Sequence, residues 1–149
     1  MTLALAGSEI AARLKENFTT GIVEADQNSL LVESESLFDI ASFLKTEPGL
    51  GFNYLVHITA VDYRDYFELV YHLVSLKHNH SLVIKTRCHD REAPAVPSLV
   101  SLWRGAELQE REIFDLMGIK FEGHPNMKRI FLWEGFPGHP LRKDFTNGA

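Results

Sequence analysis

Cysteine is nearly absent from this sequence of 149 residues, in which Cys88 stands alone. A lone cysteine forms no internal disulfide, which favours a reducing compartment. Iron–sulfur clusters are usually held by four thiolates, or by thiolates together with histidines, so this chain is not expected to hold a cluster by itself. We expect Cys88 to be a buried, unreactive thiol.

Long apolar runs are also missing. No segment reaches the ~20 apolar residues that a helix needs to cross a bilayer. The opening residues carry no basic group before Glu9, so they do not resemble a secretory signal, and they lack the arginine of a mitochondrial presequence. We therefore expect a protein of the cytoplasm, one that touches a membrane only through its partners.

Several motifs of known chemistry are absent as well. The seven histidines come without Cys-x-x-Cys or His-Glu-x-x-His spacing, which argues against a metal site. Gly49-Leu50-Gly51 lacks the third glycine of a dinucleotide-binding turn, and neither a P-loop nor a Gly-x-Ser-x-Gly nucleophile turn is present. A net charge of −5 without a dense basic stripe makes nucleic acid a poor partner.

The residues that are present predict a single domain of the α+β class. The length and the apolar content of 45% suit one folded domain. Helical spacing of apolar residues predicts helices over 8–18 and 36–45, with Ser8 and Ser36 at their N-caps. Strands are predicted for the runs rich in Val, Ile, Tyr and Phe: 21–25, 29–33, 52–62, 66–76 and 81–87. The last three are joined by short connections, which favours an antiparallel meander with helices packed on it.

The C-terminal third is organised differently. Pro94 and Pro97 mark a loop, and a short helix is predicted over 98–103. A longer helix is predicted over 106–118, where a glycine ends it. The remainder, residues 119–149, is rich in glycine and proline and is expected to consist mostly of turns. We refer to these residues as the C-terminal tail.

Charged side chains surround the helix at 106–118. On a helical wheel Glu107, Arg111 and Asp115 share one outer stripe, which we expect to face water. Glu110 falls within the apolar sector instead. A buried carboxylate needs a cation or backbone N–H groups as a partner, and we hypothesise that the tail folds back to supply a cation. Four cations of the tail are candidates: Lys128, Arg129, Arg142 and Lys143.

Two histidines of the tail, His124 and His139, each stand between a glycine and a proline. A following proline favours an extended backbone at the histidine, which suits a turn. We expect both imidazoles to fix turns by hydrogen bonding to a carbonyl or a carboxylate, in preference to binding a metal.

The pattern of charges and turns in this region resembles a known signature. The helix carries Glu110-Arg111-Glu112 followed by Asp115 and Gly118, and the tail carries two Gly-His-Pro triplets and a terminal Pro-Leu-Arg-Lys-Asp run. With these residues the chain resembles the C subunit of the proton-pumping NADH-quinone oxidoreductase, respiratory complex I. The likeness extends upstream through residues 50–52, 57–63, 70–73 and 96–103. The residues that carry the signature, and that we expect at an interface, are Glu110, Arg111, Glu112, Asp115, Gly118, His124, Pro125, Arg129, Pro140, Leu141, Arg142, Lys143 and Asp144.

The resemblance implies a role without redox chemistry in this chain. In that family the protein lies in the hydrophilic arm, against the large subunit of the quinone site and its cluster-bearing neighbour. It implies a structural subunit that supports electron transfer from NADH to quinone coupled to proton translocation. Flavin, iron–sulfur clusters and quinone are then expected in partner subunits, and the complex is expected on the cytoplasmic side of the inner membrane. The isolated chain is expected to have no catalytic activity.

Two alternatives remain open. The equivalent subunit of a membrane-bound energy-converting hydrogenase would resemble the same signature, because nothing in these residues identifies the electron donor. A stand-alone hydrolase, dependent on a metal or on a histidine–carboxylate pair, belongs to a different class of protein. It would need a nucleophile or a ligand set that the sequence does not offer.

Overall fold

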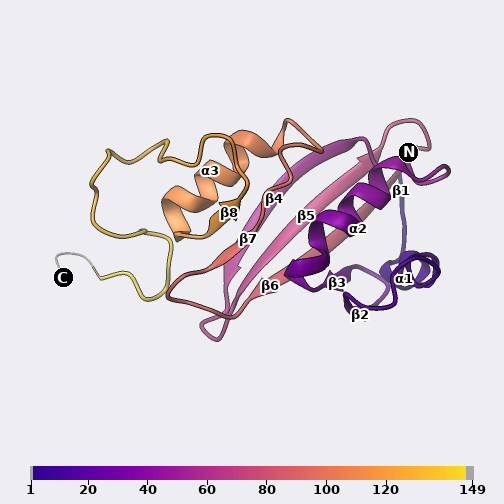
Figure 1. The fold of residues 1–149 in the computed structure, drawn as a ribbon, viewed down its shortest axis with the longest axis horizontal. Helices are drawn as coiled ribbons and strands as arrows, with labels where there is room; N and C mark the ends of the chain where they lie inside the picture. Colours follow the sequence, from indigo (N-terminus) through magenta and orange to yellow (C-terminus); the bar gives the residue numbers. More distant parts are fainter. Residues whose placement is uncertain (1, 147–149) are drawn as a thin grey trace.

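The computed structural model describes residues 2–146. Their elements in chain order are β1 (Leu3–Ala4), α1 (Gly7–Leu14), β2 (Ile22–Ala25), β3 (Leu30–Val32), α2 (Ser34–Thr46), β4 (Tyr54–Asp62), β5 (Phe67–Ser75), β6 (His80–Cys88), β7 (Ala95–Pro97), α3 (Ala106–Met117) and β8 (Lys120–Glu122). The N-terminus and the C-terminal tail lie at opposite ends of the long axis (Figure 1). The chain therefore has the predicted α+β fold.

The main sheet has the strand order β2-β3-β6-β5-β4. Strands β4, β5 and β6 form the predicted antiparallel meander, with Phe67 opposite Cys88 and Ser75 opposite His80. Strands β1 and β3 both pair with β6 in parallel, which makes the sheet mixed and was not predicted. Parallel neighbours need a long connection, here through α2 and two strands, so local turn residues do not reveal them.

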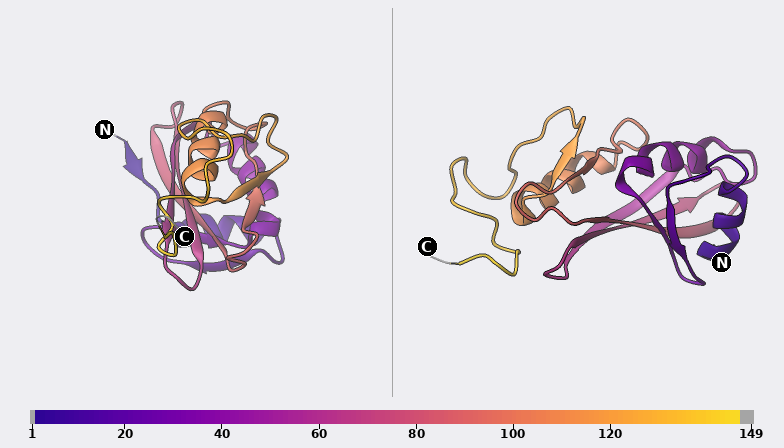
Figure 2. Two further views of the ribbon diagram at one scale, coloured as in Figure 1. Left: turned by 90° about the vertical axis from the view of Figure 1, so that its left-hand side faces the viewer. Right: turned by 60° about the horizontal axis from the view of Figure 1, so that its bottom comes forward.

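Helices α2 and α3 lie on the same face of this sheet, one after the other along its length (Figures 1 and 2). Apolar residues recur every three or four positions along α2, so that Leu37, Ile40 and Leu44 are fully buried against the sheet. Strand β5, which lies between β6 and β4, contributes Phe67 and Tyr71 to the same core. No helix among the described residues is long and apolar enough to cross a membrane.

The helix ends of the N-terminal half differ from the prediction in detail. Helix α1 begins one residue earlier than predicted and ends at Leu14, because the following residues turn and the N–H of Phe18 bonds back to the Leu14 carbonyl at 2.7 Å. Neither predicted serine cap is present: Ala6 and Glu33 occupy the N-cap positions, without side-chain cap bonds. Helix α2 ends before Pro48, as predicted.

A second, two-stranded sheet replaces the loop predicted around Pro94 and Pro97. Strand β7 pairs in parallel with β8, which was predicted as part of a turn region. The segment 98–103 forms turns and not the predicted short helix. The N–H of Ser98 continues the strand pairing by donating to the Glu122 carbonyl at 2.8 Å, so this residue is held extended at the position where the helix was expected to begin.

Candidate partner-binding surface

Helix α3 is the element that organises the C-terminal tail. It buries Ala106, Ile113 and Met117 against the domain and ends at Gly118, which has a φ of 77°. That conformation favours glycine, and a Cβ at this position would lie 2.7 Å from Cδ2 of His139. Glycine is therefore required both to end the helix and to let the tail pack against it, in agreement with the predicted boundary.

Asp115 of α3 is 0% exposed, which overturns the expectation that it faces water. Its Oδ2 atom accepts three successive backbone N–H groups, from Ile130 at 3.1 Å, Phe131 at 2.7 Å and Leu132 at 3.1 Å. Its Oδ1 atom pairs with the Arg129 guanidinium at 3.2 Å. Burial alone would raise the pKa of Asp115, but these three N–H groups and Arg129 together lower it. The tail folds back onto α3 through this carboxylate.

Further contacts hold the tail along the same helix. The Arg111 guanidinium donates to the carbonyls of Lys128 and Arg129 at 3.1 and 3.0 Å. The His124 imidazole bonds to the Glu107 carbonyl, and the His139 imidazole to the Asp115 carbonyl, each at 2.9 Å. Both histidines thus fix turns through carbonyl groups, as predicted. The tail is held by side chains that reach backbone groups, which suits a segment with little regular structure.

Glu110 has a different set of partners from the one predicted. It is 0% exposed, as its place on the wheel indicated, but none of the four predicted cations, all within the described residues, contacts it. Its carboxylate accepts the Ser98 hydroxyl at 2.6 Å and the Leu99 N–H at 2.8 Å. One of the predicted tail cations, Arg129, does bind to α3, but its partner there is Asp115 and not Glu110. The helix wheel placed Glu110 correctly and could not show which segment packs over it.

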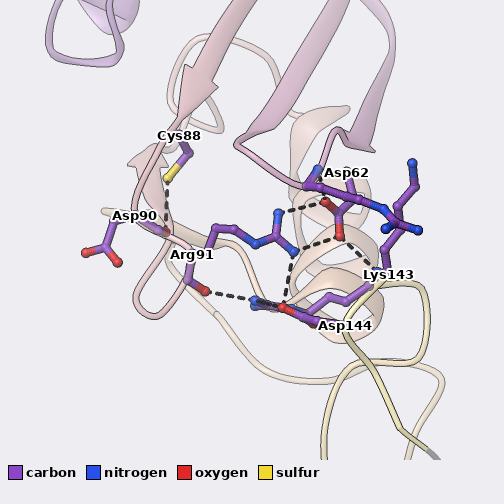
Figure 3. A network of polar contacts seen from close by, with 8 residues as sticks. Asp62, Cys88, Asp90, Arg91, Lys143 and Asp144 are labelled. Carbon is purple, nitrogen blue, oxygen red and sulfur yellow. Dashed lines mark hydrogen bonds and ion pairs between the residues drawn. The ribbon is translucent and has the colours of Figure 1, made fainter.

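A second ion-pair network ties the end of the tail to the main sheet (Figure 3). Arg91 makes two bonds to the buried Asp62 carboxylate, at 2.7 and 3.0 Å, and a third to Asp144 at 3.1 Å. Arg142 binds Asp144 and also donates to the Arg91 carbonyl at 2.8 Å. The N–H of Lys143 donates to Asp62 at 2.9 Å. The bonds from Arg91 lower the pKa of Asp62 far below its usual range.

The same network rests on an aromatic ring. The guanidinium carbons of Arg91 and Arg142 lie 4.5 and 4.9 Å from the centroid of the buried Phe67 ring. Cation–π attraction of this kind is stronger where solvent is excluded. Arg142 is therefore held by the Arg91 carbonyl, by Asp144 and by the Phe67 ring together, so its side chain is a structural part of the domain.

The remaining predicted signature residues point to solvent or to the edge of the domain. Glu112, Pro125, Leu141 and Lys143 are exposed, and Pro140 is half-buried. The structure thus divides the signature into residues that build the fold and residues that remain available to another molecule.

Large apolar side chains are exposed on the part of the tail that Asp115 holds. Phe131 is 63% exposed and Trp133 is 65% exposed, although the backbone between them is fixed to α3. Beside them lies a groove of 320 Å³ between the helix and the tail. Its lining residues are Phe114, Met127, Lys128, Arg129, Leu132, Glu134 and Gly135. An ordered backbone that presents aromatic side chains to water is typical of a binding surface.

A family model described as "Respiratory-chain NADH dehydrogenase, 30 Kd subunit" matches residues 30–149 of this chain. The chain belongs to this family. It is 48% identical to the NADH-quinone oxidoreductase C subunit of Moorella thermoacetica, over 80% of each chain. It is 39% identical to the C subunit from Roseiflexus castenholzii, over 99% of this chain and 88% of the relative. These relatives confirm the resemblance that the signature indicated.

A solved structure resembles the whole fold. A chain in the structure of the membrane-bound sulfane sulfur reductase, described as an archaeal respiratory membrane complex, superposes with a TM-score of 0.73 and 27% sequence identity. The match covers 94% of this chain and 85% of that chain. This chain therefore shares its fold with a chain of a respiratory membrane complex. The relatives favour the NADH-linked prediction over both the hydrogenase and the stand-alone hydrolase alternatives.

Sequence reasoning missed several residues that organise the site in this family member. Asp62 and Arg91 stand outside the signature, and Ser98 was taken for a helix cap. Phe131 and Trp133 were not singled out, although the run from Ile130 to Trp133 is the one apolar stretch within the turn-rich tail. That contrast in composition was the available signal for a binding surface.

Proposed function

We propose that this chain is a non-redox structural subunit of the quinone-reducing module of NADH-quinone oxidoreductase. In this role it supports electron transfer from NADH to quinone, coupled to proton translocation, without carrying out either step. The observation that carries the proposal is the family match over residues 30–149. The complex is the enzyme, and this chain contributes rigidity and assembly.

The partners that we propose are the large subunit of the quinone site and its cluster-bearing neighbour. The contact surface is the apolar part of the tail, around Phe131 and Trp133. Support comes from the way this segment is presented: Asp115 is buried and takes three backbone N–H groups to hold it. A bound partner would remove both aromatic side chains from water, which stabilises the complex by roughly 25 cal/mol for each Å² of apolar surface covered.

We further propose that the chain holds no flavin, cluster or quinone, and that these belong to its partners. Cys88 supports this view, because burial raises the pKa of its thiol and disfavours the thiolate that metals bind. Its sulfur is also engaged by the Ala95 N–H at 3.3 Å. The proposed location is peripheral, on the cytoplasmic side of the inner membrane, with membrane contact only through the complex.

Affinity purification of the tagged chain from gently solubilised membranes tests the proposal. Mass spectrometry should identify a large assembly containing flavin-binding and iron–sulfur subunits together with the quinone-site subunit. Co-purification of a nickel-binding large subunit would indicate the hydrogenase alternative instead. Recovery of the chain alone from the soluble fraction, with no membrane subunits, would refute the proposed function.

A further inference from the structure

Glu110 is a buried carboxyl group for which the described residues provide no cation. It projects from α3 toward the turn after β7, and among the described residues only two donors bond to it. The Ser98 hydroxyl is one of them, and its oxygen in turn accepts the Val100 N–H at 3.2 Å. Charged carboxylates in protein interiors normally need an opposite charge or several strong donors. Two donors without a cation leave the charge poorly compensated.

The nearest candidate for a cation is His124, whose Nε2 lies 4.0 Å from Oε1 of Glu110. Its hydrogen bonds exclude that role. Nδ1 accepts the Asn126 N–H at 2.9 Å, so Nδ1 carries no proton, and Nε2 donates its proton to the Glu107 carbonyl at 2.9 Å. A doubly protonated ring would have to give up the bond from Asn126. The hydrogen bonds of His124 therefore go to Glu107 and Asn126 and not to Glu110.

Tyr71 is the third group in this part of the core. It lies on β5, fully buried, and its hydroxyl has no hydrogen-bond partner among the described residues. Burial and the negative charge of Glu110 both raise the pKa of Tyr71. The poorly compensated Glu110 carboxylate thus acts on a buried hydroxyl that has no hydrogen-bond partner among the described residues.

We propose that Glu110 is an internal proton-binding site, which takes up a proton in the neutral pH range and packs more stably when it holds one. The protonated acid removes the buried charge, and its hydroxyl can donate to the Ser98 oxygen. Proton release restores a buried charge that Ser98 and Leu99 only partly compensate. The packing of α3 against residues 98–100 then becomes less stable.

Among the described residues, no group around Glu110 offers it an unshared positive charge. From β5 there is the Tyr71 hydroxyl, from the turn after β7 there are Ser98 and Leu99, and from the turn after β8 there is His124, which bonds to the Glu107 carbonyl. On α3 itself the charge of Glu107 is offset by Arg111, at 3.8 Å. Burial is the largest influence on the carboxyl and raises its pKa to about 7, while the two hydrogen bonds oppose the rise.

The sign of the effect on stability follows from linkage. The carboxyl holds its proton more tightly in the folded chain than in the unfolded chain, so raising the pH through this range favours unfolding. One proton released on unfolding changes the unfolding equilibrium constant by up to about tenfold per pH unit. The loss of stability begins as the pH rises above the unfolded pKa of 4.5, and it is complete once the pH exceeds the folded pKa.

Two measurements on the full chain test the proposal. The side-chain carboxyl of Glu110 is followed by ¹³C NMR from about pH 4 to pH 9, and the Leu99 amide proton is followed in parallel. We expect both signals to move with one midpoint near pH 7, because that amide donates to the carboxylate. A midpoint below about pH 5, the range of an ordinary glutamate, would overturn the proposal.

The second measurement compares urea unfolding at pH 5 and pH 8 in the wild type and in Glu110→Gln, which keeps the shape and removes the charge. Glu112→Gln, on the exposed side of the same helix, is the matched control. We expect the unfolding constants of the wild type and the control to rise between these two pH values. The rise should be at least tenfold smaller in Glu110→Gln. Equal pH dependence in all three chains would contradict the proposal. If Glu110→Gln does not fold, the NMR midpoint of the wild type decides.

Discussion

Oδ2 of Asp115 accepts the backbone N–H of Phe131 at 2.7 Å, so a buried carboxylate fixes the backbone beneath an exposed aromatic side chain. The two residues lie sixteen positions apart, one on α3 and one in the tail. Their contact joins a signature residue that stabilises the fold to an exposed side chain outside the signature, on the surface that we propose binds a partner. Substitutions at these two positions should therefore have separable effects.

Replacing Asp115 with Asn keeps the size of the side chain and removes its charge. We expect the free energy of unfolding to fall by about 3 kcal/mol, because Arg129 loses its buried partner. Hydrogen exchange at residues 130–132 should accelerate in the same variant. Urea unfolding and amide exchange measure the two effects, with Glu112→Gln as a control that should change the free energy by less than about 0.5 kcal/mol. Unaltered protection at Phe131 would show that Asp115 does not hold the tail.

Replacing Phe131 and Trp133 together with Ala should leave the isolated chain as stable as before, since both side chains are largely in water. Recovery of the other subunits in affinity purification should fall at least about tenfold, a change that corresponds to about 1.4 kcal/mol of binding energy. Leu76→Ala, equally exposed at the other end of the domain, is the control. Normal assembly of the double variant would place the partner contact elsewhere while leaving membership of the complex intact.

Asp62 and Arg91 should be strongly coupled. A double-mutant cycle with Asp62→Ala and Arg91→Ala is expected to give an interaction energy of about 2 kcal/mol, because the pair is bidentate and mostly buried. The exposed pair of Arg13 and Glu47, 4.0 Å apart, provides a matched cycle with an expected coupling below about 0.5 kcal/mol. Equal coupling in the two cycles would refute the structural role of the network.

Tyr71→Phe is expected to behave unlike most substitutions in a core. The ring stays in place and only an unpartnered hydroxyl is removed, so the free energy of unfolding should stay unchanged or rise by about 1 kcal/mol. Thermal and urea unfolding at pH 5, where Glu110 holds its proton, measure the change. A loss of stability greater than about 1 kcal/mol would mean that the hydroxyl has a hydrogen-bond partner, for which a buried water is the natural choice.

Stability of the chain should be greatest near pH 5. Asp62 has a lowered pKa, so its contribution is present above its usual value of 3.8 and is lost on acidification below it. Glu110 acts in the opposite sense, and its ionisation should remove about 3 kcal/mol as the pH rises from 4.5 to beyond 7. Urea midpoints at pH 3, 5 and 8 measure both the loss of stability in acid and the loss at higher pH. A maximum at pH 8 would contradict the assignment to Glu110.

The helix α3 shows what sequence patterns can and cannot predict. Its boundaries, the burial of Glu110 and the end at Gly118 all follow from periodicity and glycine chemistry within a dozen residues. The burial of Asp115 does not, because it depends on a tail segment that folds back over the helix. Wheel positions describe a helix alone, and any residue on its outer face can be covered by a later part of the chain.

The sheet shows the same limit. Strands joined by short turns were predicted together with their antiparallel pairing, since the connection itself fixes the direction. The parallel pairing of β3 with β6, and of β7 with β8, links segments that are far apart in the sequence. For the second pair, two prolines and a three-residue strand also weakened the local signal.

The position of Asp115 before its partners in the chain has a consequence for synthesis on the ribosome. The carboxylate is made first and stays hydrated until residues 129–132 have been added, so α3 has no complete set of bonds before that point. The aromatic residues acquire their fixed arrangement in the same step. A partner that recognises this arrangement would therefore bind only chains that extend past Trp133.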